Sequence, residues 1–405
     1  MTNHSRHKLL ILTNAPTPYR IPFFNSLHVA LERYNAELHV LYCTFREPHR
    51  QWDLHVEEQD FPWKVLPGWH PSVGDWYPHV NPSVVRVIRQ LRPTWLLSAG
   101  AWNTPTVLLA ARRVIAGSAF RMFWSESHAR AVRHSRGPIA IARRRALRAY
   151  DGFAVPNAEG AAFIKAEIGQ AAKVFLLPNT VENELFVQLS VTDRISLRGK
   201  LGIPPSNILL VTVARLVEPK GIRELIDGYQ QLPSEVRMRT TLALVGEGAL
   251  RTEAESSARS LSQGEIRIVG HLEKFGVRDW LCAADAFVLP TKRDNNPLSV
   301  IEAAFARLPL IVSRQAGNIN ELVQDGVNGF VLEAVDAASI SKVLQQLLSL
   351  DCGERQEMGR RSLAIANQNF RRDDVAQRFA QQLVAVGKFW PQHTTDLSLN
   401  ASVDS

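Results

Sequence analysis

The chain alternates short apolar runs with longer segments whose apolar residues recur at helical spacing. In the first half, the runs that resemble strands lie at residues 8–13, 37–43, 95–98, 121–124, 152–155 and 173–177. Continuous apolar runs of this length are typical of parallel strands that are covered on both faces. The pattern predicts an α/β domain in which strands and helices alternate.

The same rhythm starts again near residue 208. Further apolar runs lie at residues 208–216, 240–246, 266–270, 286–290, 308–312 and 329–333, with amphipathic helices between them. This second series predicts another doubly wound parallel sheet. A chain of 405 residues is too long for one hydrophobic core, which agrees with two domains.

The composition is that of an ordinary globular protein, with 45% hydrophobic and 21% charged residues. Cys43, Cys282 and Cys352 are odd in number and far apart, so they indicate neither a disulfide framework nor a metal site. We therefore expect a reducing, cytoplasmic location. We also expect no signal peptide, because the apolar run after Lys8 is short.

Charge is concentrated in the first half of the chain. Residues 1–180 carry 22 Lys and Arg against 12 Asp and Glu, and Arg143, Arg144, Arg145 and Arg148 lie in one predicted helix. A basic half can bind nucleic acid or an anionic membrane, or can simply be a solvated face. No zinc-finger spacing or RNP-type aromatic motif accompanies it, so nucleic acid is disfavoured as a partner. An anionic membrane surface stays open.

Residues 46–82 lack clean periodicity and carry Trp52, Trp63, Trp69 and Trp76. A long irregular insertion in a compact domain is usually functional or mobile. We expect most of the four indoles to pack on their own domain. The alternative is that they stack on sugar rings or rest at a lipid interface.

The main candidate for chemistry is the loop after the apolar run at 286–290. This polar loop leads to Pro297, which predicts a helix start because the missing N–H costs least there. Free N–H groups at a helix N-terminus attract anions. Asp294 precedes this helix and Glu302 lies within it, eight positions apart.

Three other predicted strand ends carry candidate residues. Arg215 and Lys220 lie on one strand-to-helix loop, and two such cations suit a diphosphate. Gly246 and Gly248 stand where the backbone must turn sharply into a helix. His271 follows the next strand.

The acidic-x7-acidic spacing of Asp294 and Glu302, followed by Ala-Ala, resembles the signature of the retaining glycosyltransferases of family 4. The segments around Arg215, Gly246 and His271 stand in that family's order. The resemblance departs at Asp294, where the family usually has Glu. It covers residues 208–330 well, whereas the first half resembles the family only in its PTPYR loop and overall rhythm.

The resemblance implies the GT-B fold: two Rossmann-like, doubly wound parallel-sheet domains that face each other across a cleft. It places the hinge near residues 178–190. The implied parts are an acceptor-side domain at 1–185, a donor-binding domain at 186–372, a helix at 373–390 that packs back on the first domain, and a disordered tail at 391–405.

The resemblance also implies a role for each candidate. Arg215 and Lys220 would neutralise the donor diphosphate, and Asp294 would bind hydroxyls of the donor sugar. Glu302 would hold the ribose hydroxyls. The strand ends at Gly246, Gly248 and His271 would meet the nucleotide, and the main chain of Asn295, Asn296, Pro297 and Leu298 would assist at the sugar.

On the acceptor side, the loop with Pro18, Tyr19 and Arg20 resembles the one that faces the acceptor. Glu126 and His128 follow another predicted strand, where the family often carries a His or an acid near the reacting sugar. Spacing does not decide between these two residues.

The resemblance therefore implies a retaining hexosyltransferase that uses a UDP- or GDP-sugar and a glycan or lipid-linked acceptor, of the type that makes bacterial lipopolysaccharide and other surface polysaccharides. No Asp-x-Asp metal motif is present, so we expect neither a metal nor another cofactor. The expected location is the cytoplasm, with peripheral attachment to the inner membrane face as an option. Alternatives are a nucleotide-sugar epimerase of the same fold and a non-catalytic subunit that binds sugar nucleotides.

Overall fold

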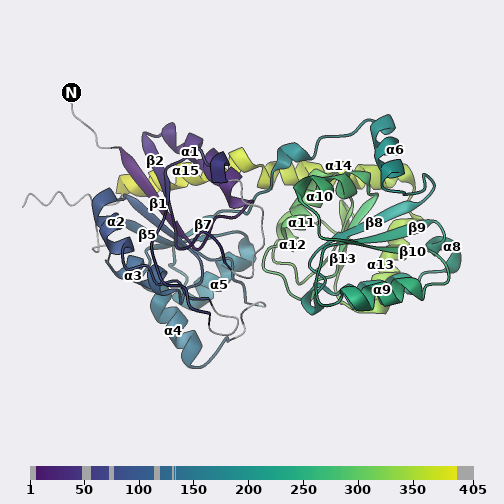
Figure 1. Cartoon of the computed structure of the whole chain (residues 1–405), viewed down its shortest axis with the longest axis horizontal. Helices are drawn as coiled ribbons and strands as arrows, with labels where there is room; N and C mark the ends of the chain where they lie inside the picture. Colours follow the sequence, from purple (N-terminus) through teal and green to yellow (C-terminus); the bar gives the residue numbers. More distant parts are fainter. Residues whose placement is uncertain are drawn as a thin grey trace, which may run out of the picture.

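The computed structural model describes residues 6–47, 56–72, 77–113, 119–129, 132 and 134–389. The predicted tail at 391–405, together with Trp52 and Trp76, lies outside the described residues. Two sheets form the centres of two domains that lie side by side (Figure 1). The prediction of two doubly wound, parallel-sheet domains is confirmed.

The first sheet has the order β3-β2-β1-β4-β5-β6-β7 within the described residues, and its neighbouring strands pair in parallel. Its strands are β1 His7–Thr13, β2 Ala36–Tyr42, β3 Trp63–Val65, β4 Trp95–Ala99, β5 Phe120–Trp124, β6 Gly152–Val155 and β7 Val174–Leu176. The helices of this domain are α1 Arg20–Glu32, η1 Val56–Glu58, α2 Val84–Leu91, α3 Pro105–Arg113, α4 Pro138–Leu147 and α5 Ala158–Ile168.

The second sheet has the order β10-β9-β8-β11-β12-β13, also with parallel neighbours. Its strands are β8 Ile208–Val213, β9 Thr240–Val245, β10 Glu265–Gly270, β11 Ala286–Leu289, β12 Leu310–Ser313 and β13 Gly329–Leu332. The helices from the hinge onward are η2 Asn183–Leu185, α6 Val191–Lys200, η3 Glu218–Lys220, α7 Ile222–Gln230, α8 Ser234–Arg237, α9 Arg251–Arg259, α10 Lys274–Ala283, α11 Leu298–Phe305, α12 Ile319–Leu322, α13 Ala337–Ser349, α14 Cys352–Phe370 and α15 Arg372–Phe389.

Side chains of β1 show why its run is apolar at every position. Leu9 and Ile11 face the layer that contains α1, whereas Leu10 and Leu12 face the layer of α2 and α3. All four are buried. Since both faces of the strand are covered, each side chain contributes about 2 kcal/mol of burial free energy.

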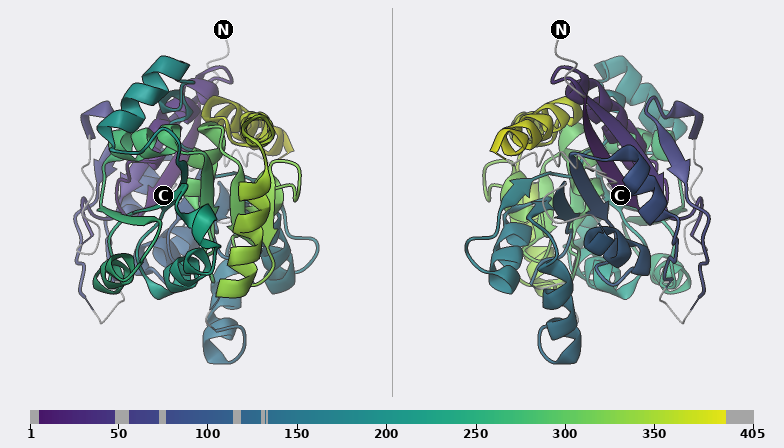
Figure 2. Two further views of the ribbon diagram at one scale, coloured as in Figure 1. Left: turned by 90° about the vertical axis from the view of Figure 1, so that its right-hand side faces the viewer. Right: turned by 90° about the vertical axis from the view of Figure 1, so that its left-hand side faces the viewer.

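The last helix, α15, returns to the first domain and lies against α1 (Figure 1, Figure 2). Phe379 of α15 is buried in the same core as the strands of the first sheet. Polar contacts fix the helix at its edge, because Ser26 donates to Asp373 at 2.7 Å and Arg33 donates to Gln377 at 2.9 Å. The chain therefore crosses between the domains twice.

Two sequence-based expectations need correction. The stretch 46–82 is not wholly irregular, because Trp63–Val65 forms the edge strand β3 beside β2. This strand has only three residues and is preceded by Pro62, so it leaves no periodic signal. Trp69 does not pack on its domain, since it is 68% exposed.

The basic helix is also less solvated than its sequence indicates. Arg143 of α4 is buried and pairs with Glu167 of α5, with Arg143 Nη2 2.9 Å from Glu167 Oε2. Arg144 reaches the same carboxylate at 3.3 Å. Arg145 and Arg148 are exposed, so only part of the row is a surface charge.

Candidate active site

The centre of the second sheet holds the candidate donor site. Strands β8 and β11 are neighbours, and the chain leaves β8 toward β9 but leaves β11 toward β12. Loops that diverge in this way open a crevice at the carboxyl ends of the strands, where open α/β sheets bind ligands. Both predicted polar loops of the donor side start there.

The two loops meet through an ion pair between Lys220 Nζ and Asp294 Oδ2. The two side chains are only 17% and 14% exposed. Arg215, on the same loop as Lys220, is exposed and makes no ion pair with a described residue. The structure therefore brings Lys220 and Asp294 together and leaves the Arg215 guanidinium exposed on the same loop.

Close backbone packing holds this pair of loops in place. The Pro219 carbonyl accepts hydrogen bonds from Thr291 Oγ1 and from the Lys292 N–H, both at 2.8 Å. Gly221 has a φ of +68°, and a Cβ added there would lie 2.0 Å from the Pro290 carbonyl oxygen. Only glycine fits this approach, and the sequence reasoning missed Gly221 because its role depends on a neighbouring strand.

Gly246 and Gly248 press a third loop onto the Arg215 loop. Their φ angles are +141° and +157°, and a Cβ would lie 2.0 Å from the Ala214 oxygen and 2.3 Å from the Leu216 oxygen. The predicted sharp turn is thus a close contact between two loops. The Gly246 loop therefore packs directly against the backbone on either side of Arg215.

His271 lies farther out, after the edge strand β10. Its side chain is 63% exposed and its Nε2 lies 3.3 Å from Glu273 Oε1. The main chain just before it contacts the Gly246 loop, because the Gly246 N–H donates to the Gly270 carbonyl at 2.8 Å. The imidazole does not join the Lys220–Asp294 pair.

The start of α11 offers fewer main-chain donors than the sequence indicates. The helix begins at Leu298, and Pro297 has no N–H. The Asn296 N–H donates to Asp294 Oδ1 at 3.2 Å, so it orients the carboxylate. Among the described residues, the N–H groups of Asn295 and Leu298 have no acceptor. The Asn296 side-chain amide is buried and unpaired within the same set.

Glu302 occupies a different environment from Asp294. It lies one turn into α11, half-buried, and its carboxyl makes no hydrogen bond with a described residue. Burial, together with the nearby charge of Glu182, raises the pKa of Glu302 to about 7. Glu182 comes from the hinge and itself pairs with Lys274 at 3.1 Å. A half-buried carboxyl without a partner is suited to receive hydroxyl donors from a ligand.

On the opposite domain, Arg20 anchors the predicted acceptor loop. It lies at the start of α1, donates to Thr13 at 3.0 Å and to Glu126 at 3.2 Å, and stacks 4.6 Å from the Trp124 ring. Burial opposes its charge, but the neighbouring Tyr19 and Glu126 more than compensate and raise the pKa of Arg20. Beside it, Pro18 is exposed and Tyr19 is half-buried.

The Glu126 carboxylate is held from two sides. Asn179 of the hinge segment donates to the same Oε1 atom that receives Arg20, also at 3.2 Å. Glu126 is therefore held in a fixed position at the carboxyl end of β5. The contact between Asn179 and Glu126 has no sequence signal, because the two residues lie 53 positions apart.

His128 lies between the two domains. It is 1% exposed, and its Nε2 lies 3.2 Å from the Asp294 carbonyl oxygen. Because a carbonyl only accepts, Nε2 carries the proton in this contact. A Cβ added to Gly317 would lie 3.2 Å from the same ring. The structure thus joins His128 to the main chain of the donor loop and leaves the side chain of Glu126 on the acceptor side.

A second contact across the domains lies at the start of α5. The Ala158 N–H donates to Glu321 Oε1 at 2.8 Å, and Asn320 Nδ2 lies 3.5 Å from Glu159 Oε1. Neither pair has a sequence signal, because each joins residues more than 160 positions apart. With His128, these contacts hold the two carboxyl edges against each other.

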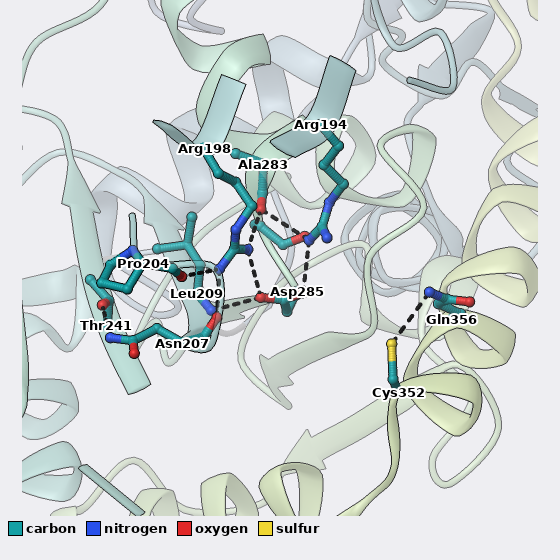
Figure 3. Close-up of polar contacts among 11 residues, drawn as sticks. Arg194, Arg198, Pro204, Asn207, Leu209, Thr241, Ala283, Asp285, Cys352 and Gln356 are labelled. Carbon is teal, nitrogen blue, oxygen red and sulfur yellow. Dashed lines mark hydrogen bonds and ion pairs between the residues drawn. The ribbon is translucent and has the colours of Figure 1, made fainter. Parts of the chain in front are cut away.

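A cavity of about 540 Å³ lies elsewhere, near the amino ends of β11 and β12. Its walls include Arg194, which reaches Asp285 at 2.7 Å, and Cys352 at the start of α14 (Figure 3). Arg198 also binds Asp285, at 3.0 Å, so α6 is tied to the sheet there. Because ligands of open α/β sheets bind at the carboxyl ends, we place the candidate site at Lys220 and Asp294 and not in this cavity.

Within the described residues, no group of three or more His, Cys, Asp or Glu side chains is arranged to hold a metal ion. None of the described helices combines the length and the apolar composition that a membrane span requires.

Two facing doubly wound domains, with the polar groups at the inner edge of each sheet, define the GT-B class of fold. Residues 193–363 match the family model described as Glycosyl transferases group 1. Over these residues the second half of the chain is therefore similar to the glycosyl transferases group 1 family.

Curated relatives match the same half. A D-inositol 3-phosphate glycosyltransferase of Xylanimonas cellulosilytica is 28% identical over 50% of this chain and 49% of its own length. The lipopolysaccharide core biosynthesis glycosyltransferase LpsE of Rhizobium meliloti is 26% identical over 46% of this chain and 53% of its own. The chain thus spans about half the length of the curated relatives that it matches.

Solved structures match both domains. The Anabaena protein Alr3699/HepE, in a complex with UDP, superposes with a TM-score of 0.74 at 17% identity, over 93% of this chain and 100% of that one. An identity this low shows the fold alone. The predicted GT-B fold class is confirmed.

Proposed function

We propose that this protein is a retaining glycosyltransferase, which transfers a hexose from a UDP- or GDP-sugar to a glycan or lipid-linked acceptor in the synthesis of a cell-surface polysaccharide. The observation that supports this proposal best is the Lys220–Asp294 pair at the switch point of a domain that is similar to the glycosyl transferases group 1 family. The HepE structures with UDP and UDP-glucose support a nucleotide-sugar donor, and LpsE supports a surface-glycan product.

The pair fits the junction between a sugar and its diphosphate. Lys220 would meet the negative charge that develops on the leaving diphosphate, and Arg215 would close on its outer oxygens. Asp294 would accept hydrogen bonds from the sugar next to that phosphate. Because Asp294 and Lys220 are in contact, one crevice could hold the diphosphate at Lys220 and the sugar hydroxyls at Asp294.

Glu302 and the opposite domain complete the site. The half-buried carboxyl of Glu302, with its pKa near 7, would accept hydrogen bonds from the ribose hydroxyls. Glu126 stands across the cleft, held by Arg20 and Asn179, where an acceptor hydroxyl would approach. We expect transfer to persist in the presence of EDTA, because Lys220 and Arg215 supply the positive charge themselves.

The test is incubation with labelled UDP- and GDP-sugars and a mixed pool of glycan and lipid-linked acceptors. Transfer with the anomeric configuration of the donor retained, as determined by NMR, is the expected result. Exchange at C2 of the sugar without an acceptor would instead identify an epimerase. Binding of donor without any turnover would identify a non-catalytic subunit.

We further propose that the acceptor is presented at an anionic membrane surface that binds α4. This helix projects from the first domain (Figure 1, Figure 2). Ile139 and Ile141 are 46% and 65% exposed, beside the exposed Arg145 and Arg148. Apolar and basic side chains on one projecting helix are suited to a lipid interface. The protein would then work at the cytoplasmic face of the membrane.

Vesicle sedimentation checks this proposal. Attraction is worth about 1 kcal/mol per basic residue and is screened by salt. We expect binding to vesicles with anionic lipid, loss of binding at high salt, and weaker binding of Arg145→Glu with Ile141→Ser. Equal binding to neutral and anionic vesicles, unaffected by salt, would contradict the role of α4.

A further inference from the structure

A second polar cluster lies on the same inner edge of the first domain. Asn14 directly follows β1 and Glu47 comes after β2, so both lie at the carboxyl edge of the sheet, as Arg20 and Glu126 do. His79 sits between them and the insertion, and it is fully buried.

A continuous chain of hydrogen bonds joins the cluster. Asn14 Nδ2 donates to Glu47 Oε1 at 3.2 Å, and His79 Nε2 lies 3.1 Å from the same oxygen. His79 Nδ1 lies 3.1 Å from His70 Nδ1. The last contact follows from the backbone, since Trp69 and Val80 form an antiparallel bridge that places His70 opposite His79.

The contacts constrain where the protons lie. Glu47 is an acceptor, so His79 Nε2 carries a proton, and of the two facing Nδ1 atoms of His79 and His70 one donates to the other. In the tautomer in which His70 donates from Nδ1, its Nε2 is an acceptor. Burial, helped by His79, lowers the pKa of His70 and so favours this neutral form. His70 Nε2 has no hydrogen-bond partner among the described residues.

The side chains of this cluster are not needed to hold the backbone of the insertion. Asn81 Nδ2 donates to the carbonyl oxygens of Cys43 and Leu66 at 2.9 and 3.1 Å. Thr106 Oγ1 donates to the His79 carbonyl at 2.8 Å. Among the described residues, the backbone of the insertion is thus held by Asn81 and Thr106, and the polar side chains of the cluster pair with one another.

Its outer atoms are mostly acceptors. Asn14 Oδ1 is buried and has no partner among the described residues. In the tautomer that donates from Nδ1, His70 Nε2 is a second acceptor. The Tyr77 ring stands edge-on to His79 at 5.4 Å and adds an apolar face. Several acceptors beside an aromatic ring match a ligand that has many hydroxyl donors and an apolar face, which is the chemistry of a sugar ring.

We propose that Asn14, Glu47, His70 and Tyr77 form a subsite that binds a sugar residue of the acceptor glycan, away from the reacting hydroxyl. This inference rests on the proposed function, because it takes the inner edge of the first domain as the acceptor side. Glu47 and His70 bind this sugar, and His79 is a positioning residue that sets the tautomer of His70. The subsite selects the acceptor and leaves the donor site unchanged.

The test compares the full-length protein with its variants Glu47→Gln and His70→Phe, each saturated with UDP, on an array of immobilised mono- and oligosaccharides. Glu37→Gln is the matched control, because Glu37 lies at the other end of β2 and pairs with Lys8. UDP affinity and the slow hydrolysis of UDP-glucose without acceptor are measured in parallel. We expect at least a 10-fold loss of glycan affinity in both variants, with UDP affinity, hydrolysis and the control unchanged.

Each outcome of this experiment is decisive. Unchanged glycan affinity in Glu47→Gln and His70→Phe, or no glycan binding by the wild type, would overturn the subsite. Parallel loss of glycan and UDP binding in the variants would show a structural role and would overturn it as well. A wild type that binds glycan but binds neither UDP nor GDP and hydrolyses no UDP- or GDP-sugar would refute the proposed transferase while keeping the subsite.

Discussion

Replacing Lys220 with alanine is expected to lower kcat/KM for the nucleotide sugar by about 100-fold or more. The ammonium group is lost from the place where the leaving diphosphate gains charge. The Asp294 carboxylate also loses its ion-pair partner in a site where it is 14% exposed, and the unpaired charge repels an anionic donor. Steady-state kinetics with the UDP- or GDP-sugar that supports transfer measure the effect.

Arg215→Ala should lower kcat/KM to a similar extent, but the two variants should differ in stability. Arg215 is exposed and has no ion-pair partner among the described residues, so its loss should leave the free energy of unfolding unchanged. Lys220→Ala should cost about 1–3 kcal/mol, because a largely buried carboxylate stays unpaired. Lys342→Ala on α13 is the control for loss of a surface lysine. Wild-type turnover in either variant would end the assignment of that residue.

Glu302→Gln is expected to weaken binding of the donor and of the free nucleoside diphosphate alike. Each charge-assisted hydrogen bond to a ribose hydroxyl is worth about 1.5–3 kcal/mol, so we expect a 10- to 100-fold loss of affinity. Asp294→Asn acts only at the sugar, so it should lower turnover and leave nucleoside diphosphate affinity intact. Calorimetric titration of UDP and GDP into both variants separates the two roles.

Glu302→Gln is also expected to change the free energy of unfolding, by an amount that depends on pH. Glu302 ionises with a pKa of about 7 when folded, against about 4.3 in the unfolded chain. The folded state therefore binds more protons between these values, and the free energy of unfolding falls as the pH rises from 4 to 7. Glu302→Gln removes this loss, so without ligand its free energy of unfolding should exceed that of the wild type by about 3–4 kcal/mol at pH 8 and by only about 1 kcal/mol at pH 5.

Denaturant unfolding at the two pH values measures this difference. If Glu302 instead serves its own helix through a cap or a pair, the variant would be less stable than the wild type at both pH values. Equal UDP affinity in wild type and Glu302→Gln would mean that the spacing from Asp294 to Glu302 has no bearing on nucleotide binding.

Local patterns in the chain were enough to predict the two doubly wound domains. Continuous apolar runs such as the one in β1 arise because both faces of a parallel strand are covered, and this leaves a signal in consecutive residues. The loops after β8 and β11 were predicted for the same reason. A βα unit is formed by consecutive residues. A polar loop that follows a strand in the sequence, such as the loop with Asp294, therefore lies at the carboxyl end of that strand.

The tertiary structure decided which of these loops meet. The Lys220–Asp294 pair exists because β8 and β11 are neighbours in the sheet, although they are separated by two other strands in the chain. Gly221 likewise has no room for a Cβ, because the carbonyl oxygen of Pro290, which follows β11, lies against it. Strand order depends on the packing of all the helices together, so no short window of sequence contains it.

Contacts between distant segments also overturned the simplest interpretation of single residues. Arg143 looked like one member of a solvated basic row, but it is buried against Glu167 of the next helix. His79 looked like part of an irregular loop, but it joins Glu47 and His70 at the edge of the sheet. A side chain's charge is visible in the sequence, whereas its burial and its partner are set by segments that fold against it from elsewhere in the chain.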